Sequence, residues 1–516
     1  MDKKWIKNGL RKDQLGGKEE AGKKNWENKN WQGKKEWFHA FLMDYLILFL
    51  TWSGMFQRSF NCDTLFHLMR PETDIIGRCE GGRYLSGLTD YILYRFGRTT
   101  ADHTGITVFA AVFLLAVSVW LVQWGFRGEI SCDTLYGKFA YYAVTALMFC
   151  NVLFSESLMF GECALMFGLA YLFASLGIVL FTKGNYGAAF FLFLCSAMEY
   201  QVGVVYAAMI LSVWIFLHNR YRITLRTVVQ ELVCGLITFG AGLLDMMSIS
   251  VLVKTGILEK AEKGAGIGDF AGKIGICAEN FASLLTDCRG LLPKVWLPLL
   301  LLLLACGIVL RKFAAEKNGM AALYFLLLVA ALILMIYVLP MAQISCMTYP
   351  RLVWVFYVMQ SMLLLVALRC TGERGKVLMC YACCAYLAVQ VMFCHIIVTN
   401  HMTSNTLDKT YVAMFCRQVE KYEAQTGIRV EKLAVANDTD CPPSYHNVSY
   451  KTDQINERAL GTVTNTLVNA VSGRTFEKVP MDGEVFRTYF EGKNWDWFDA
   501  EEQIVILGDT AYWVIF

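Results

Sequence analysis

Charged residues and prolines are scarce in this 516-residue chain. Only 18% of the residues are charged and 8 are prolines, whereas a soluble domain is usually about 25% charged. Hydrophobic residues make up 56% of the chain, above the roughly 45–50% of soluble proteins. The shortage of charge argues against an ordinary soluble enzyme and indicates a protein that lies largely within a membrane.

Motifs of several common protein classes are also absent. The sequence has no glycine-rich nucleotide loop and no internal repeat of the kind that many transporters carry. The CxxC spacing from Cys380 to Cys383 lies in an apolar run without a second pair or a histidine cluster, so a zinc site is not expected. We therefore expect no cofactor, while a divalent metal ion stays open.

Eighteen cysteines are present, mostly inside apolar runs. A free cysteine in such a run packs as a small hydrophobic residue. Cys62 with Cys79, and Cys277 with Cys288, are candidate disulfide pairs if they lie outside the cell, where conditions are oxidising.

Apolar runs long enough to cross a bilayer recur through residues 38–399. About 20 helical residues cover the roughly 30 Å of hydrocarbon, and a segment in lipid must satisfy its own backbone hydrogen bonds. The run 186–217 is too long for one span, and a split at Glu199-Tyr200-Gln201 places HNRYR with the other basic clusters. We predict an all-α polytopic membrane bundle of about eleven spans, at about 38–56, 105–124, 139–154, 162–182, two within 186–217, 229–252, 293–310, 320–340, 352–368 and 377–399.

Positive charge sets the predicted orientation. Residues 1–37 carry eleven lysines and arginines and show no signal-peptide pattern, so we expect a basic cytoplasmic tail. Its tryptophans, interleaved with lysines, also suit contact with anionic lipid of the bilayer, and we expect no nucleic-acid partner. Counting spans from this tail places the long loop 57–104 and residues 400–516 outside the cell, in a multi-pass protein of the cell membrane.

Residues 400–516 are polar and mixed, which predicts a small extracytoplasmic α/β domain. The stretch 407–425 has a helical pattern that stops at Gly427. RVEKLAVAND predicts a strand, INERALGTVTNTLVNAV a helix, and EQIVILGDTAYWVIF a hairpin around Gly508-Asp509.

Loop 57–104 concentrates side chains that are suited to chemistry. Asp63 follows the first span, where a carboxylate at the edge of a low-dielectric region can serve as a general base; the alternative is a solvated loop aspartate. Asp74 is a further candidate on the same grounds. Arg78 and Arg83, in GRCEGGRY, suit bidentate phosphate binding, or they neutralise the acids of the loop.

Other polar residues flank the remaining outer turns. Residues 84–96 carry an apolar helical face, which predicts a helix lying flat at the membrane interface or one packed on the bundle. Glu156 and Glu199 lie in or near spans, where ionisable residues suggest function, with helix capping as the rival explanation. Arg351 stands on the outside against the positive-inside trend, so it needs an anionic partner, either a ligand phosphate or an acid of another loop.

Three stretches, taken in order, resemble a known family. NCDTLFHLMRPETDIIGRCEGGRYLSGLTDYIL resembles the first loop of the bacterial and bacteriophage type II glucosyltransferases, SAMEYQVGVVYAAM their Tyr-Gln element, and TSNTLDKTYVAMFCRQVEKYEAQTG the start of their tail domain. These enzymes are GT-C membrane glycosyltransferases that modify O-antigen or related cell-surface glycans. The resemblance covers roughly residues 38–516. The chain departs from the family in the Arg83-Tyr84 pair, where Arg-Trp is common, and in Cys62, which stands where a second acid is frequent.

The resemblance implies a GT-C-like fold and transfer of a hexose, glucose in the family, from a polyprenyl-phosphate sugar donor to a glycan acceptor with inversion. Asp63 would deprotonate the acceptor hydroxyl, and arginines would stabilise the charge that develops on the phosphate. A transporter or flippase of lipid-linked sugars is the alternative. The predicted site comprises Asp63, Asp74 and Glu199 as catalytic residues, and Asn61, Arg78, Arg83, Tyr84, Glu156, Tyr200, Gln201 and Arg351 as substrate-binding residues.

Overall fold

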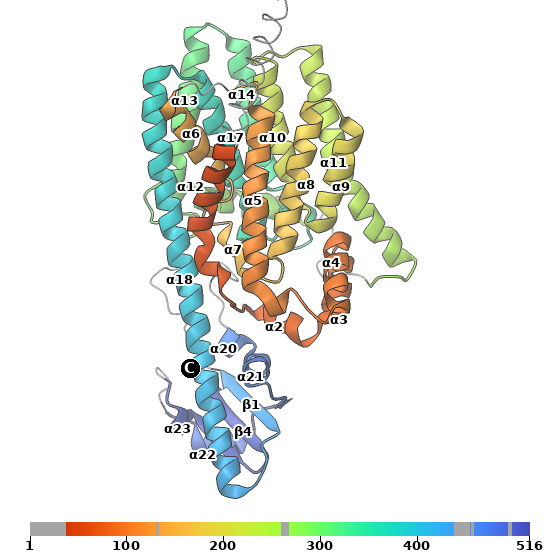
Figure 1. Cartoon of the computed structure of the whole chain (residues 1–516), viewed down its shortest axis with the longest axis vertical. Coiled ribbons are helices and arrows are strands. Elements are labelled where there is room, and N and C mark those ends of the chain that lie inside the picture. Colours follow the sequence, from red (N-terminus) through yellow and green to blue (C-terminus); the bar gives the residue numbers. More distant parts are fainter. Residues whose placement is uncertain are drawn as a thin grey trace, which may run out of the picture.

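The computed structural model describes residues 38–130, 134–259, 268–437, 455, 459–493 and 498–515. The basic tail predicted for residues 1–37 lies outside the described residues. The described residues are mostly helical (74%), and their helices form an elongated bundle with a small sheet-containing domain at one end (Figure 1). The predicted class, a helical membrane bundle with a C-terminal sheet, is confirmed at this level.

Eight helices of the described chain are long and apolar enough to cross a membrane. Each reaches at least 18 residues, and at a rise of about 1.5 Å per residue that length covers most of a hydrocarbon core. They are Phe38–Phe56, Ala101–Phe126 (mostly α5, Thr104–Phe126), α8 (Ala164–Thr182), α11 (Leu225–Lys254), α13 (Leu297–Ala315), α14 (Gly319–Ile336), Pro350–Cys370 (α16, Pro350–Val353, with α17, Val355–Cys370) and α18 (Glu373–Thr426).

The other three predicted spans correspond to shorter helices. α6 (Leu135–Ala146), α9 (Tyr186–Glu199) and α10 (Val202–His218) have 12, 14 and 17 residues, or about 18–26 Å of helix. The count of eleven spans therefore stays a prediction. The split of the long apolar run is confirmed, because Tyr200 is extended and separates α9 from α10.

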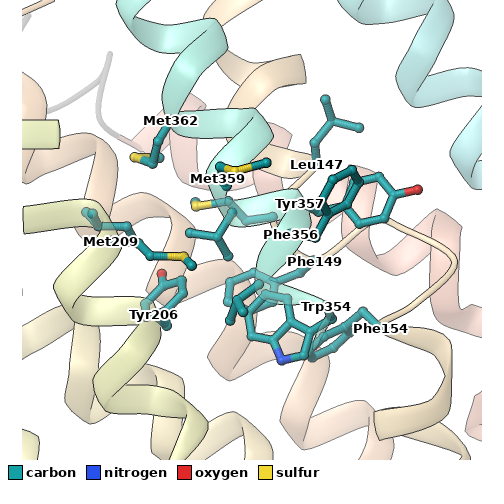
Figure 2. Packing of buried hydrophobic residues seen from close by; sticks show 14 of the residues in the cluster. Leu147, Phe149, Phe154, Tyr206, Met209, Trp354, Phe356, Tyr357, Met359 and Met362 are labelled. Carbon is teal, nitrogen blue, oxygen red and sulfur yellow. The ribbon is translucent and has the colours of Figure 1, made fainter. Parts of the chain in front are cut away.

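Aromatic side chains fill the middle of the bundle (Figure 2). The Trp354 ring lies 4.9 Å from the ring of Tyr171 and 5.0 Å from that of Phe154, measured between centroids. α10 and α17 are buried on nearly every side, which explains why their sequences are apolar all round. α5 and α8 approach closely at Gly168, where an added Cβ would lie 2.9 Å from the Cα of Ala111.

Loop 57–104 contains more helix than its sequence predicts. The expected helix is confirmed as α4 (Tyr84–Arg95), but α2 (Cys62–Met69) and α3 (Pro71–Glu80) precede it, and a 3-10 turn at Ala101–His103 follows. Asn61 caps α2 and Pro71 opens α3 at its first position, where a proline costs no hydrogen bond. These short helices cover the end of the bundle nearest the C-terminal domain (Figure 1).

α18 is a single helix of 54 residues, about 80 Å long. The sequence predicts a span at 377–399 and a separate helix at 407–425, and this break is wrong. The polar residues between them, NHMTSNT, include neither proline nor glycine, so the backbone continues as a helix out of the bundle. The helix ends as predicted at Gly427, whose φ is +71°.

The C-terminal domain packs a four-stranded sheet against the end of α18. The strand order is β2-β1-β4-β3, with parallel β2/β1 and β1/β4 pairs and an antiparallel β4/β3 hairpin. The predicted hairpin around Gly508-Asp509 is confirmed, and Phe415 of α18 stacks on Trp513 at 5.0 Å between ring centroids. The elements are β1 (Lys432–Asn437), α20 (Ala459–Thr462), α21 (Thr464–Ser472), β2 (Glu477–Val479), α22 (Gly483–Tyr489), α23 (Ala500–Gln503), β3 (Ile504–Leu507) and β4 (Thr510–Ile515).

The domain and the first loop share one hydrophobic core. Phe60 and Leu65 are buried in the same cluster as Phe415 and Trp513. The Asn405 side chain of α18 accepts a hydrogen bond from the Phe60 backbone nitrogen at 2.7 Å and donates one to its carbonyl oxygen at 3.0 Å. The position of α2 is therefore set partly by the C-terminal domain.

The predicted loop 253–292 also holds a helix, α12 (Phe270–Thr286), and α7 (Ser155–Met159) and α15 (Val338–Ala342) are further short turns of helix. The cysteines proposed as disulfide pairs are all free. Cys277 lies next to Cys346, with 3.7 Å between the sulfurs, while Cys288 contacts the Tyr357 hydroxyl.

Candidate functional site

A polar cavity of about 250 Å³ lies between the short helices of the first loop and the adjoining ends of the bundle helices. Six residues of the predicted site line it, and residues outside that predicted site line the rest. The predicted ones are Asp63, Asp74, Arg78, Arg83, Tyr200 and Arg351, and the others are His67, Gly77, Phe160, Glu162, Cys163 and Phe167.

Asp63 is in the first turn of α2, half-buried, at the wall of this cavity. Asn61 positions that turn: its Oδ1 accepts a hydrogen bond from the Thr64 backbone nitrogen at 2.7 Å, and its Nδ2 donates to the Met159 carbonyl at 3.0 Å. Asn61 is therefore a cap and a tether to the segment before α8, and it is not among the lining residues. The capping fixes where α2 begins, and therefore where the backbone of Asp63 lies.

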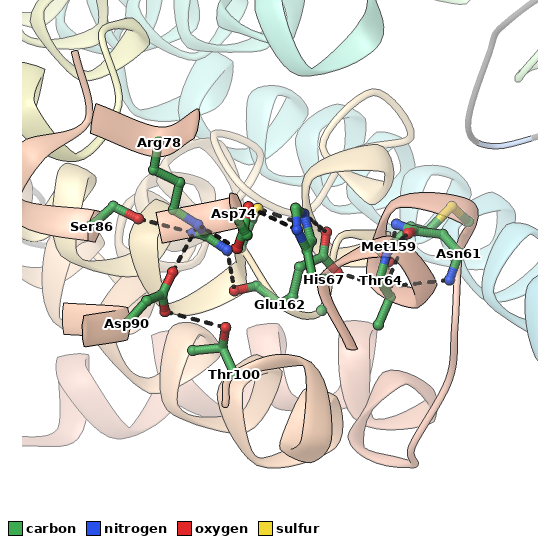
Figure 3. A network of polar contacts seen from close by, with 12 residues as sticks. Asn61, Thr64, His67, Asp74, Arg78, Ser86, Asp90, Thr100, Met159 and Glu162 are labelled. Carbon is green, nitrogen blue, oxygen red and sulfur yellow. Dashed lines mark hydrogen bonds and ion pairs between the residues drawn. The ribbon is translucent and has the colours of Figure 1, made fainter. Parts of the chain in front are cut away.

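Arg78 is buried in a network of acids (Figure 3). Its Nε lies 2.7 Å from Asp90 Oδ2 and 3.1 Å from Asp74 Oδ2, and its Nη1 donates to Ser86 Oγ at 2.9 Å. Its Nη2 donates to the Glu162 carbonyl at 3.4 Å. The guanidinium that the sequence suggests for phosphate thus already has two carboxylate partners.

Asp74 also holds His67, whose Nδ1 lies 2.7 Å from Asp74 Oδ1. Burial raises the pKa of Asp74, but the hydrogen bond from His67 and the charge of Arg78 outweigh it, so the pKa is lowered overall. Burial lowers the pKa of His67, but its bond to Asp74 and the nearby Glu162 raise it overall. The two groups therefore stabilise each other in their charged forms.

Glu162 and Cys163 end the segment that leads into α8. The Glu162 carboxylate is buried, accepts a hydrogen bond from the Thr64 hydroxyl at 2.6 Å, and lies 3.8 Å from His67 Nε2. Cys163 Sγ is 3.7 Å from Glu162 Oε1. Burial raises the pKa of both the Glu162 carboxyl and the Cys163 thiol, because it disfavours their charged forms.

Arg83 contrasts with Arg78. It forms no ion pair with any acid in the described part of the chain, its buried Nε has no hydrogen-bond partner, and its guanidinium carbon lies 5.3 Å from the centre of the Tyr200 ring. The preceding Gly82 has a φ of +79° in a close-packed turn, which the Gln201 side chain holds by donating to the Gly81 carbonyl at 2.9 Å. This turn places Arg83, a cation without an ion pair among the described residues, at the wall of the cavity.

Arg351 has the acidic partner that its position requires. Its backbone nitrogen and Nη1 donate to the two carboxylate oxygens of the fully buried Glu156, at 2.7 and 3.0 Å. The Tyr200 hydroxyl donates to the Arg351 carbonyl at 3.1 Å, and burial raises the pKa of Tyr200 to about 12. Of the two partners considered for Arg351, an acid of another loop is the one observed.

Four other predicted residues are not among those that line the cavity, in addition to Asn61. Glu156 lies behind Arg351, and Gln201 braces the Gly81-Gly82 turn. The Tyr84 hydroxyl accepts from Ser248 of α11 at 3.1 Å. Glu199 lines a small separate void beside Arg78 and Asp90.

Sequence reasoning missed His67, Glu162 and Cys163 as a group. His67 has the character of an ordinary loop residue and Cys163 that of a packing residue, and Glu162 is only one of two acids flanking a turn. The one local signal is the Glu-Cys pair at the start of an apolar span, because an acid there is costly without partners. Its partners lie about a hundred residues away, which no local pattern reveals.

A larger groove of about 410 Å³ lies elsewhere, between the first span, α6 and α18. Its lining is almost entirely apolar, including Met43, Ile47 and Leu387, so it offers little for chemistry.

The polar cavity combines a carboxylate, a guanidinium without an ion pair and a guanidinium with one, which suits proton abstraction beside an anionic group. Comparisons with protein-family models, with characterised proteins and with solved structures give no match, so function must be inferred from this site.

Proposed function

We propose that the protein is a membrane glycosyltransferase that transfers a hexose from a polyprenyl-phosphate donor to a hydroxyl of a cell-surface glycan. One observation carries the proposal: Asp63 shares a cavity of about 250 Å³ with Arg351 and with Arg83, which has no ion pair in the described chain. A carboxylate base and cations for a phosphate are what such a transfer needs. The order of the three sequence stretches that resemble type II glucosyltransferases supports the same reaction.

The roles follow from charge. Asp63 takes the proton of the acceptor hydroxyl as the oxygen attacks the anomeric carbon. The bond from that carbon to the phosphate oxygen breaks, the configuration inverts, and the polyprenyl phosphate leaves with the bonding electron pair. Arg83 and Arg351 stabilise the charge that develops on the phosphate. Arg78, held between Asp74 and Asp90, supports the wall of the site.

The surroundings of the cavity suit a lipid-linked donor. Leu88, Tyr91, Ile92 and Phe96, on or next to α4, are 47–79% exposed. Apolar side chains exposed beside membrane-spanning helices are typical of a helix at the membrane interface, which favours this alternative over packing on the bundle. The polyprenyl chain would stay in the bilayer while its phosphate enters the cavity.

The side of the membrane comes from the basic residues. We infer that the cavity and the C-terminal domain face outside, where flipped lipid-linked sugars and surface glycans meet, and that the N-terminus is cytoplasmic. The C-terminal domain stands at the cavity end of the bundle (Figure 1) and shares a core with α2. It is well placed to bind the acceptor glycan.

The test compares surface glycans by mass in cells with the natural protein and with Asp63→Asn. We expect the natural protein to add one hexose and the variant to lose at least about 100-fold in transfer rate, because a general base contributes about 10²–10⁴-fold. Glu72→Gln is the matched control: Glu72 is exposed on α3, and a glutamine keeps an acceptor for the Tyr94 hydroxyl that it binds at 2.8 Å. A natural protein that changes only the leaflet distribution of lipid-linked sugar would instead support a flippase, and retained transfer in Asp63→Asn would remove the base assignment.

A further inference from the structure

Three side chains at the inner wall of the polar cavity have ligand atoms that converge on one point. The His67 imidazole, the Glu162 carboxylate and the Cys163 thiol each offer one ligand atom, and all three atoms lie within 4.8 Å of one another. We propose that these residues form a zinc site. The inference concerns metal binding and stands independently of the transferase reaction.

The spacing fits a tetrahedral ion. Zinc bonds of about 2.0–2.3 Å in tetrahedral geometry place ligand atoms about 3.3–3.7 Å apart. His67 Nε2 and Cys163 Sγ lie 3.8 and 3.7 Å from Glu162 Oε1. All three ligand atoms already lie within 4.8 Å of one another, so tetrahedral binding requires the His67 nitrogen and the Cys163 sulfur to approach by at most about 1 Å.

The residues behind the ligands orient them as in known zinc sites. Asp74 Oδ1 lies 2.7 Å from His67 Nδ1 (Figure 3), so Nδ1 donates to Asp74, and Nε2 binds the metal once the ion has displaced its proton. A carboxylate in this position fixes the ring and makes it a better ligand. The Thr64 hydroxyl holds Glu162 Oε2 at 2.6 Å, which leaves Oε1 directed toward His67 and Cys163.

Local charge favours a cation at this point. Glu162 is fully buried, and its one ion-pair partner among the described residues is His67, whose Nε2 lies 3.8 Å from Oε1. The nearest buried guanidinium, that of Arg78, is paired with Asp74 and Asp90. A buried carboxylate normally has a paired charge or a metal, and a bound ion also removes the proton from a coordinating thiol.

The ligand types select the metal and indicate its role. A thiolate with an imidazole and a carboxylate suits Zn²⁺ better than Mg²⁺ or Ca²⁺, which prefer oxygen ligands alone. Three protein ligands leave a fourth position open, as in catalytic zinc sites. His67, Glu162 and Cys163 all line the cavity that also contains Asp63, so this open position would accept water or an oxygen of a bound phosphate.

The test uses the full chain purified in detergent, stripped with a chelator and titrated with Co²⁺ as a spectroscopic substitute for zinc. We expect one Co²⁺ per chain with a thiolate-to-cobalt charge-transfer band, and displacement of the Co²⁺ by an equivalent of Zn²⁺. Cys163→Ser should abolish the band, and Asp74→Asn should weaken binding about 10- to 100-fold. Cys79→Ser, a half-buried cysteine in the same loop, should bind as the natural protein does.

Absence of stoichiometric Co²⁺ binding in the natural chain would overturn the proposal, as would a charge-transfer band that survives in Cys163→Ser. If Cys163→Ser does not fold, Glu162→Gln takes its place, and it should lower the affinity for Co²⁺ at least 10-fold while the band shifts. Unchanged affinity in Glu162→Gln would equally refute the site. Because the readout is bound metal, failure here leaves the proposed transfer reaction standing, and failure of the transfer assay leaves the metal site standing.

Discussion

Arg78 and Arg83 are five residues apart and line one cavity, yet the structure gives them opposite energetic roles. We predict that Arg83→Ala reduces transfer and leaves the protein stable, whereas Arg78→Ala destabilises the fold. Arg83 forms no ion pair with an acid in the described chain, and its guanidinium carbon lies 5.3 Å from the centre of the Tyr200 ring. Its removal therefore leaves no buried carboxylate without a partner.

The magnitudes follow from these contacts. A hydrogen bond to a charged group contributes about 1.5–3 kcal/mol, so loss of one bond from Arg83 to the departing phosphate corresponds to about 10- to 150-fold in kcat/KM. Removal of Arg78 leaves Asp74 and Asp90 buried without their guanidinium, and breaking a buried pair costs about 3–5 kcal/mol. Arg83→Lys, which keeps the charge and loses the fork, should fall between the natural protein and Arg83→Ala.

The assay measures hexose transfer by the purified full chain with a polyprenyl-phosphate hexose, together with thermal unfolding in the same detergent. We expect Arg83→Ala to unfold within about 1 °C of the natural protein, since a substitution without strong partners changes stability little. Transfer within threefold of the natural rate in Arg83→Ala would refute the phosphate role. An unfolding temperature for Arg78→Ala equal to that of Arg83→Ala would refute the distinction between them.

Two further predictions concern the C-terminal domain. Asn405→Ala should speed hydrogen exchange at residues 59–62, because it removes two hydrogen bonds to the Phe60 backbone worth about 1 kcal/mol each. Asn405→Asp, which keeps the hydrogen-bond acceptor, should have a smaller effect. Equal exchange rates in the natural protein and both variants would contradict the link between α18 and α2. The hydrogen bonds from Arg474 to Glu423 lower the pKa of Glu423 in the folded protein. The stability that this pair adds is therefore fully present above the usual glutamate pKa of about 4.3. It is lost as the pH falls through the lower pKa that Glu423 has in the folded protein. Glu423→Gln should therefore raise the hydrogen-exchange rate in β1 relative to the natural protein at pH 7, and the two rates should be equal near pH 3. A difference in rate that persists at low pH would exclude the Arg474–Glu423 pair as its cause.

Much of the helical architecture was predictable because its signals are local. The split at Tyr200, the stop at Gly427 and the hairpin at Gly508-Asp509 each depend on a few neighbouring residues, and all three are confirmed. The false break in α18 shows the limit of the same reasoning. A change from apolar to polar residues marks where a helix leaves the lipid, but it does not end the helix unless a residue interrupts the backbone.

The candidate site was predictable only as a set of residue types. The sequence by itself determines that acids and arginines gather in the first loop, between apolar helices that embed the chain in a membrane. Only the tertiary structure decides that Arg78 has two ion pairs and Arg83 has none among the described residues, and that His67 meets Glu162 and Cys163 across about 95 residues. The physical reason is that helix formation depends on neighbours along the chain, whereas the charge state and role of a buried group depend on which distant side chains packing brings within a few ångströms.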